Sequence, residues 1–178
     1  EDMGMFYHPQ TYMEILNLRD YLKTHRDDID RFIEMVSISR LHGHSVGFFS
    51  AYSFPQISIP KSNQIKINQT RGAEPDYREV KGRILKKAKS ILKDGELDLI
   101  RQWGRRSLLT TADSRDLKGW QSNSVKLIVT SPPFLDQVNY IQDSWIETWF
   151  CGIDARDLEK RSFKLLPWRN GFSSCRTH

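Results

Sequence analysis

The stretch that decides the predicted fold reads Val125-Lys126-Leu127-Ile128-Val129-Thr130-Ser131-Pro132-Pro133-Phe134. Its first six residues are mostly apolar and β-branched, as in a buried strand, and two consecutive prolines end that strand abruptly. Beyond the prolines, apolar residues recur at three- and four-residue steps and predict a helix over 134–150. A strand, a rigid loop and a helix in this order are typical of a site at the carboxyl end of a sheet strand.

A second predicted strand precedes this stretch. A short apolar segment from Ser107 runs into Asp113, and a turn-like segment over 118–124 leads to Val125. Two strands that end in Asp113 and in a Ser-Pro-Pro turn are best explained as neighbours in a sheet covered by helices. We therefore expect an α/β fold in which 107–178 form part of the sheet domain.

The first 106 residues have a mainly helical pattern. Apolar spacing predicts a helix over 9–23, and a second helix, capped by Asp27 or Asp28, that ends near Gly43. The segment 43–72 shows no helical period and is expected to be a long irregular connection, of the kind that often forms binding loops. A third helix is expected over about 75–94.

This third helix has a strongly basic face. Lysines and arginines alternate with the apolar positions Val80, Ile84 and Ile91, and more arginines follow after residue 100. A solvated charged face is one interpretation, and contact with nucleic-acid phosphates is the other. The candidate nucleic-acid-binding residues are Lys81, Lys86, Lys87, Lys89, Arg105 and Arg106.

Two histidines and several aromatic residues lie in or beside the 43–72 connection. His42 and His44 have no third ligand nearby in the sequence, so we expect ordinary polar loop histidines and no metal site. Aromatic residues such as Phe48 and Tyr52 are suited to stacking on bases, although packing of the loop onto the body is the commoner role.

Composition restricts the class of protein. The chain has 178 residues, a formal charge of +5, 38% hydrophobic residues and two cysteines without metal-ligand spacing. No apolar run approaches the roughly 20 residues that cross a bilayer, and no signal peptide is recognisable. We expect a soluble, cytoplasmic protein without a membrane partner. Because the sequence begins with Glu1, we also expect a fragment whose upstream segment is missing.

The Ser131–Phe134 loop, with Ala112-Asp113-Ser114-Arg115-Asp116-Leu117 upstream, resembles the catalytic loop and acidic element of the amino-methylating DNA methyltransferases. The resemblance implies a Rossmann-like methyltransferase sheet, preceded here by a helical segment. It also implies methyl transfer from S-adenosylmethionine to an exocyclic amine of a base in double-stranded DNA. The serine form of the loop is closer to the cytosine-N4 branch than to the adenine-N6 branch, and it suggests a restriction-modification system.

The same resemblance assigns roles within the loop. The Ser131 hydroxyl and the Pro132 carbonyl accept hydrogen bonds from the target amine, Phe134 stacks on the extruded base, and Pro133 shapes the loop. Asp113 and Thr130 are the implied cofactor contacts. No covalent enzyme intermediate is needed, since the amine attacks the sulfonium methyl directly.

The family's glycine-rich cofactor loop, Phe-x-Gly-x-Gly, has no match in these 178 residues. Either an upstream segment of the same protein supplies it, or this chain does not bind S-adenosylmethionine by itself. In both cases we expect the fragment alone to be inactive or weakly active. Two further interpretations stay open: Ser131–Phe134 as a purely structural turn, and the chain as a nucleic-acid-binding module without catalysis.

Overall fold

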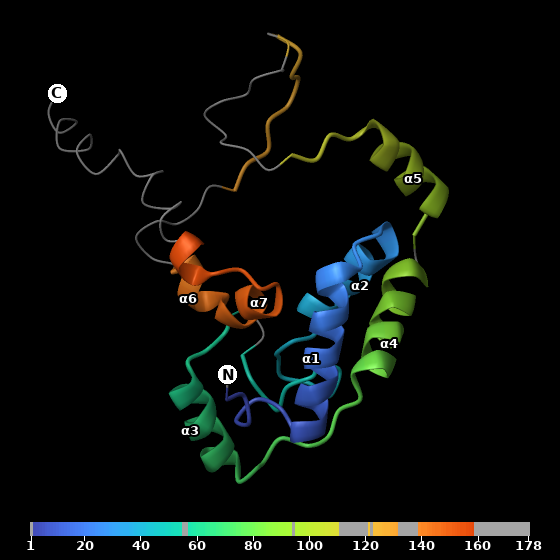
Figure 1. The fold of residues 1–178 in the computed structure, drawn as a ribbon. Coiled ribbons are helices and arrows are strands. Elements are labelled where there is room, and N and C mark those ends of the chain that lie inside the picture. The colour runs from blue at the N-terminus through green and yellow to red at the C-terminus, as the bar shows by residue number, and fades with distance from the viewer. Residues whose placement is uncertain are drawn as a thin grey trace, which may run out of the picture.

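The computed structural model describes residues 2–54, 57–93, 95–110, 121, 123–131 and 139–158. Its helices are α1 (Pro9–Thr24), α2 (Asp28–Ile38), α3 (Lys61–Arg71), α4 (Val80–Lys93), α5 (Leu97–Arg106), α6 (Tyr140–Asp143) and α7 (Trp145–Phe150). Figure 1 shows α1 between the α6–α7 pair on one side and α4 on the other. No helix in this part of the chain is long and apolar enough to cross a membrane.

Local chemistry explains where the first helices begin. Pro9 occupies the first turn of α1, where its missing N–H costs nothing. Asp27 and Asp30 form a reciprocal capping box at the start of α2: the Asp27 carboxylate accepts from Asp30 N at 2.8 Å, and the Asp30 carboxylate accepts from Asp27 N at 3.2 Å. Both helices predicted from the sequence are confirmed, with α2 ending earlier than expected.

Helix α4 begins at Val80 because α1 provides its N-terminal partners. The Thr11 hydroxyl donates to Arg78 O at 3.0 Å and accepts from Arg78 N at 2.8 Å. The Glu14 carboxylate accepts from Val80 N at 2.8 Å, which satisfies a helix N–H that has no partner within the helix. These contacts fix the non-helical segment before α4 against the middle of α1.

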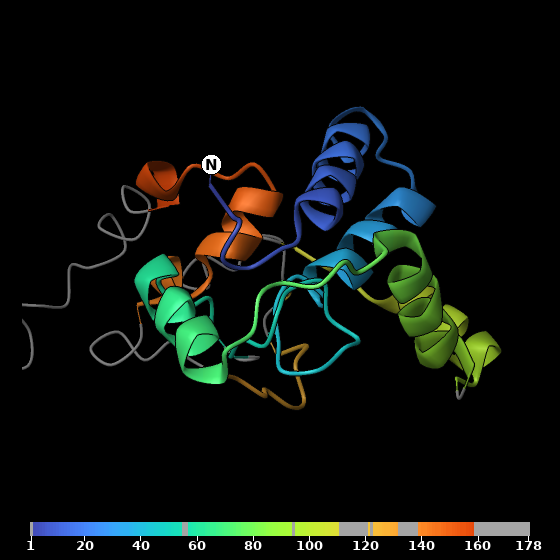
Figure 2. The ribbon, with the colours of Figure 1, turned by 90° about the horizontal axis from the view of Figure 1, so that it is seen from below.

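One apolar core joins the helices. Its members come from the N-terminal segment, α1, α2, the 41–59 segment, α4 and α7, and they are Met3, Phe6, Tyr7, Ile15, Leu22, Val36, Leu41, Phe49, Ile59, Val80, Ile84, Ile146 and Phe150. Aromatic contacts connect α7 to this core, since Trp145 lies 5.7 Å from Phe6 and Trp149 lies 5.9 Å from Tyr12, between ring centroids. Figure 2, seen from below, shows α7 and α1 close together.

The α/β expectation, with its Rossmann-like sheet, is wrong for the described residues. They contain helices and one isolated bridge, Gly43 with Tyr52, but no strand of a sheet. In the predicted strand segments, the described residues 107–110 and 125–130 form no strand, and Ile128 and Val129 are 78% and 87% exposed. A β-branched run favours a strand only when a neighbouring backbone pairs with it, and these segments have no such neighbour in the described chain.

Two further expectations need correction. The segment 43–72 is irregular only in part, because α3 occupies Lys61–Arg71 and ends at Gly72, whose φ of 55° is left-handed and suits glycine. The helix predicted over 134–150 is confirmed in its second half, where it consists of α6 and α7 separated by Ser144. Residues 132–138 lie outside the described part.

The packing around α1 gives a direct stability prediction. Ile15 is fully buried in the core, whereas Met13 on the same helix is 55% exposed. We expect Ile15→Ala to lower the free energy of unfolding by about 2–5 kcal/mol, because it leaves a cavity. Met13→Ala, the control, should change it by less than about 0.5 kcal/mol in the same urea titration. Equal effects of the two substitutions would contradict this packing.

Candidate functional site

The predicted catalytic loop is described only at its start. Thr130 and Ser131 are both exposed, while Pro132, Pro133 and Phe134 lie outside the described residues. Asp113, the other predicted cofactor contact, also lies outside them. A cofactor as large as S-adenosylmethionine is normally enclosed on most sides. The described surroundings of Thr130 do not provide such an enclosure.

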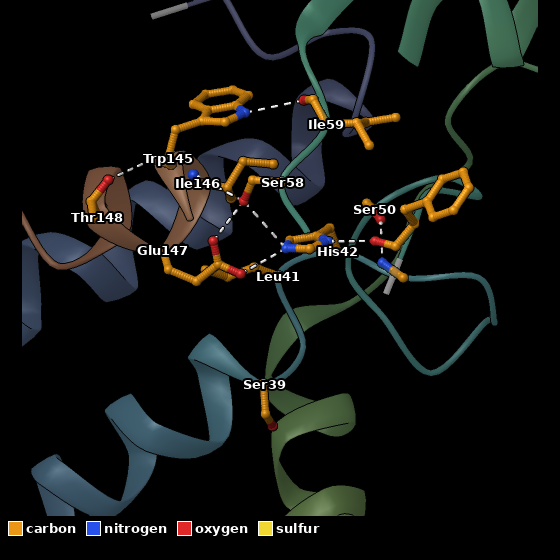
Figure 3. A network of polar contacts seen from close by, with 12 residues as sticks. Ser39, Leu41, His42, Ser50, Ser58, Ile59, Trp145, Ile146, Glu147 and Thr148 are labelled. Atoms are coloured by element: carbon orange, nitrogen blue, oxygen red, sulfur yellow. Dashed lines mark hydrogen bonds and ion pairs between the residues drawn. The ribbon is translucent and has the colours of Figure 1, made fainter. Parts of the chain in front are cut away.

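A largely buried polar network holds residues 143–147, which follow the predicted catalytic loop (Figure 3). The Ser58 hydroxyl donates to Glu147 Oε2 at 2.6 Å, and His42 Nε2 lies 2.7 Å from Glu147 Oε1. His42 and Ser58 are 5% and 3% exposed. We call His42, Ser58 and Glu147 the anchor network.

Backbone contacts extend the anchor network along α6 and α7. Ser58 N donates to Asp143 O at 2.6 Å, and Ile146 N donates to the Ser58 hydroxyl at 3.2 Å. The Trp145 indole N–H donates to the neighbouring Ile59 carbonyl at 3.1 Å. The chain is thus fixed from Asp143 onward against the 58–59 segment, nine residues after the predicted Phe134 stack.

The combination of serine, histidine and glutamate is not arranged as a nucleophilic triad. In a triad the carboxylate and the hydroxyl contact opposite ring nitrogens of the histidine. Here both contact the Nε2 side, with Ser58 Oγ 3.4 Å from Nε2, and the Nδ1 atom lies 2.7 Å from Phe54 O. The Ser58 hydroxyl donates to a carboxylate and is not activated by a base. The geometry therefore supports a structural anchor.

The anchor network changes the protonation of both charged partners. Burial acts to lower the pKa of His42, but the hydrogen bonds to Glu147 and Phe54 outweigh it and raise that pKa above 6.5. Burial acts to raise the pKa of Glu147, but the hydrogen bonds from His42 and Ser58 outweigh it and lower that pKa below 4.5. An imidazolium facing two acceptors and a carboxylate facing two donors is the satisfied state.

The predicted nucleic-acid-binding residues lie on two helices. Lys81, Lys86 and Lys89 are exposed on α4, and Lys87 on the same helix is half-buried. Arg105 and Arg106 are exposed on α5, where they line a hollow of about 450 Å³ together with Asp98, Arg101 and Gln102. Five residues correspond to about 140° around a helix, so Lys81 and Lys86 lie on different sides of α4. The structure therefore brings together only part of this set.

Sequence reasoning missed the residues that fix this region. Glu147 and Ser58 were not singled out, and His42 was expected to be an ordinary loop residue. The separation of 105 residues between His42 and Glu147 explains this, because no local pattern reports a partner that distant. Arg78 and Arg83 donate hydrogen bonds to carbonyls of the 43–53 loop, whereas the sequence indicated only that they belong to a basic helix.

Comparison with known proteins finds no matching family model, no matching curated protein and no matching solved structure. Any function must therefore be inferred from the residues of this chain.

The anchor network predicts a specific pH dependence. A histidine with a raised pKa stabilises the fold fully below about 6.5 and loses that effect as the pH rises through its folded pKa. A glutamate with a lowered pKa stabilises it above about 4.5 and loses that effect as the pH falls through its folded pKa. We therefore expect the contribution of the pair to be greatest between these two values.

Glu147→Gln should lower the free energy of unfolding by about 1.5–3 kcal/mol near pH 5.5 and weaken its decline toward pH 8. Asp98→Asn removes an exposed ion pair with Arg101 and is the control, with an expected change below about 1 kcal/mol. Urea denaturation at several pH values measures both. A wild-type pH profile preserved in Glu147→Gln would contradict the charged pairing.

Proposed function

We propose that this chain carries the base-gripping loop of an S-adenosylmethionine-dependent DNA methyltransferase that modifies an exocyclic amine, cytosine N4 rather than adenine N6. The observation that carries the proposal is the sequence Ser131-Pro132-Pro133-Phe134 directly after the apolar segment 125–130. The proposal includes double-stranded DNA as the substrate, a cytoplasmic location and a restriction-modification system as the setting.

The chemistry of the loop residues supports this assignment. A serine hydroxyl and a proline carbonyl are hydrogen-bond acceptors, and a phenylalanine ring offers a face for stacking. Acceptors held near the amine favour the positive charge that develops on its nitrogen as the new bond forms.

Exposed lysines and arginines of α4 and α5 support DNA as the substrate. Lys86, Lys89, Arg105 and Arg106 are exposed, and the chain has a formal charge of +5. Each lysine or arginine that neutralises a phosphate releases counterions and adds affinity without regard to sequence. The same observation favours the second candidate, a nucleic-acid-binding module without catalysis. Methyl transfer separates the two candidates.

The catalytic proposal is tested by Ser131→Ala and Phe134→Ala in the intact protein that carries this chain. We expect each variant to lower the rate of methyl transfer to DNA on the order of 100-fold, because an acceptor or a stacking face is removed. Binding of S-adenosylmethionine, measured by calorimetry, should change little. Ser124→Ala is the matched control, since Ser124 is an exposed serine seven residues earlier. Unchanged transfer in both loop variants would refute the mechanism.

DNA binding by the basic surface is tested by the double variant Lys86→Gln/Lys89→Gln. We expect weaker binding to any duplex. The slope of the logarithm of the binding constant against the logarithm of the salt concentration should decrease in magnitude by about 0.9 for each phosphate that the variant no longer neutralises. The control is Lys23→Gln/Lys66→Gln, which removes two lysines from α1 and α3 instead. Fluorescence anisotropy at several salt concentrations measures both. Identical salt slopes in the two double variants would show that Lys86 and Lys89 do not contact DNA phosphates.

A further inference from the structure

The loop over 43–53 has a rigid backbone, because a buried arginine holds it from inside. The Arg78 side chain is 9% exposed, and its Nη1 donates to Ser45 O at 3.1 Å, to Phe48 O at 3.3 Å and to Ser50 O. The Asp76 carboxylate accepts from Arg78 Nε at 2.9 Å. Hydrogen bonds from a charged donor are stronger than neutral ones, so three carbonyls are held at one point.

Backbone hydrogen bonds also hold together the two ends of the 43–53 loop. Phe49 N donates to Arg40 O at 2.8 Å, and Ser53 N donates to Gly43 O at 2.9 Å. A Cβ atom at Gly43 would lie 2.5 Å from the Phe48 ring, so only glycine allows this approach. The loop is therefore a preformed projection, visible in cyan between α3 and α4 in Figure 2.

The tip of this loop presents one apolar side chain to solvent. Val46 is 73% exposed, and His44 and Ser45 beside it are exposed as well. We call residues His44–Gly47 the loop tip.

Arginines lie beside the loop tip, together with the carboxylates Asp76 and Glu79, whose charges act on Arg83. Arg83 on α4 donates from Nε to Val46 O at 2.9 Å, and the Arg40 guanidinium lies 4.2 Å from the centroid of the Phe48 ring. Lys87 follows Arg83 by four residues and so lies one turn further along the same edge of α4, with Lys86 next to it. Arg83 thus connects the loop tip to the edge of α4 that carries Lys86 and Lys87.

We propose that the loop tip is a DNA wedge, in which Val46 enters the base stack while Arg83, Lys86 and Lys87 contact the flanking phosphates. The proposal rests on the proposed methyltransferase function and deepens it by naming an element that assists base extrusion. Extrusion unstacks a base at a cost of a few kcal/mol. Apolar side chains inserted at a base step are a known way to offset such a cost.

The chemistry of the surface favours a polyanion over a protein partner. A protein interface of ordinary size buries about 800 Å² on each side and has an apolar centre formed by several residues. The loop tip offers a single apolar side chain beside cations, a combination that suits a base step flanked by backbone phosphates. Rigidity also suits insertion, because a preformed wedge loses little conformational entropy on binding.

The test compares Val46→Ser with wild type in the full chain, on a duplex that carries 2-aminopurine. We expect Val46→Ser to weaken duplex binding about 10-fold, which corresponds to the removal of one buried apolar side chain, and to reduce the fluorescence rise that reports unstacking. The salt slope should stay unchanged, because no phosphate contact is removed. Ile29→Ser, a change at a 69% exposed apolar residue of α2, is the control and should bind as wild type does.

Each outcome bears on the proposal. If wild type binds and unstacks the duplex and Val46→Ser does so equally well, the wedge is wrong while the proposed function stands. If wild type fails to bind DNA, both the wedge and the proposed function fail. Circular dichroism and thermal unfolding verify that Val46→Ser remains folded, as expected for an exposed side chain. A reduced salt slope in Val46→Ser would assign the weaker binding to phosphate contacts and overturn the wedge.

Discussion

The contact between His42 and Glu147 is the constraint on which the C-terminal part of the structure depends. It joins residues 105 positions apart, and the Ser58 hydroxyl shares it. Because both ring nitrogens of His42 face acceptors, the imidazole is held in one orientation. The packing of Ile146 and Phe150 into the core follows from this contact, since α7 is too short to stay helical alone.

Irregular segments of the described chain are fixed by side chains in place of sheet pairing. Arg78 holds three carbonyls of the 43–53 loop, and Thr11 satisfies both backbone groups of Arg78 itself. Gln64 and Asn68 do the same around α3, donating to Tyr52 O and Met5 O, both at 2.8 Å. Buried backbone groups require partners, and a helical body without a sheet must supply them from its side chains.

The sequence predicted what local chemistry decides. Proline at the start of α1, the Asp27 cap of α2 and the apolar spacing of α4 all act within a few residues. Those three helices were predicted, although α4 begins at Val80 and not near residue 75. A strand forms only when a distant segment pairs with it, so the apolar residues 125–130 led to the wrong prediction of a strand. Helix α3 was missed because its stability comes from long-range hydrogen bonds of Gln64 and Asn68 and not from an apolar stripe. The anchor network could not be predicted from the sequence either, because its contacts also join residues that are far apart in the chain.

One member of the anchor network, His42, lies close in sequence to the loop tip, so the two are mechanically linked. His42 directly precedes the 43–53 loop, and Val46 in the loop tip is four positions further along the chain. Arg78 makes this projection rigid, while Glu147 fixes the chain that follows the predicted base-gripping loop to His42. The His42–Glu147 pair therefore sets the spacing between α7 and the 43–53 loop. Its hydrogen bonds are directional, so they define that spacing more precisely than apolar packing alone.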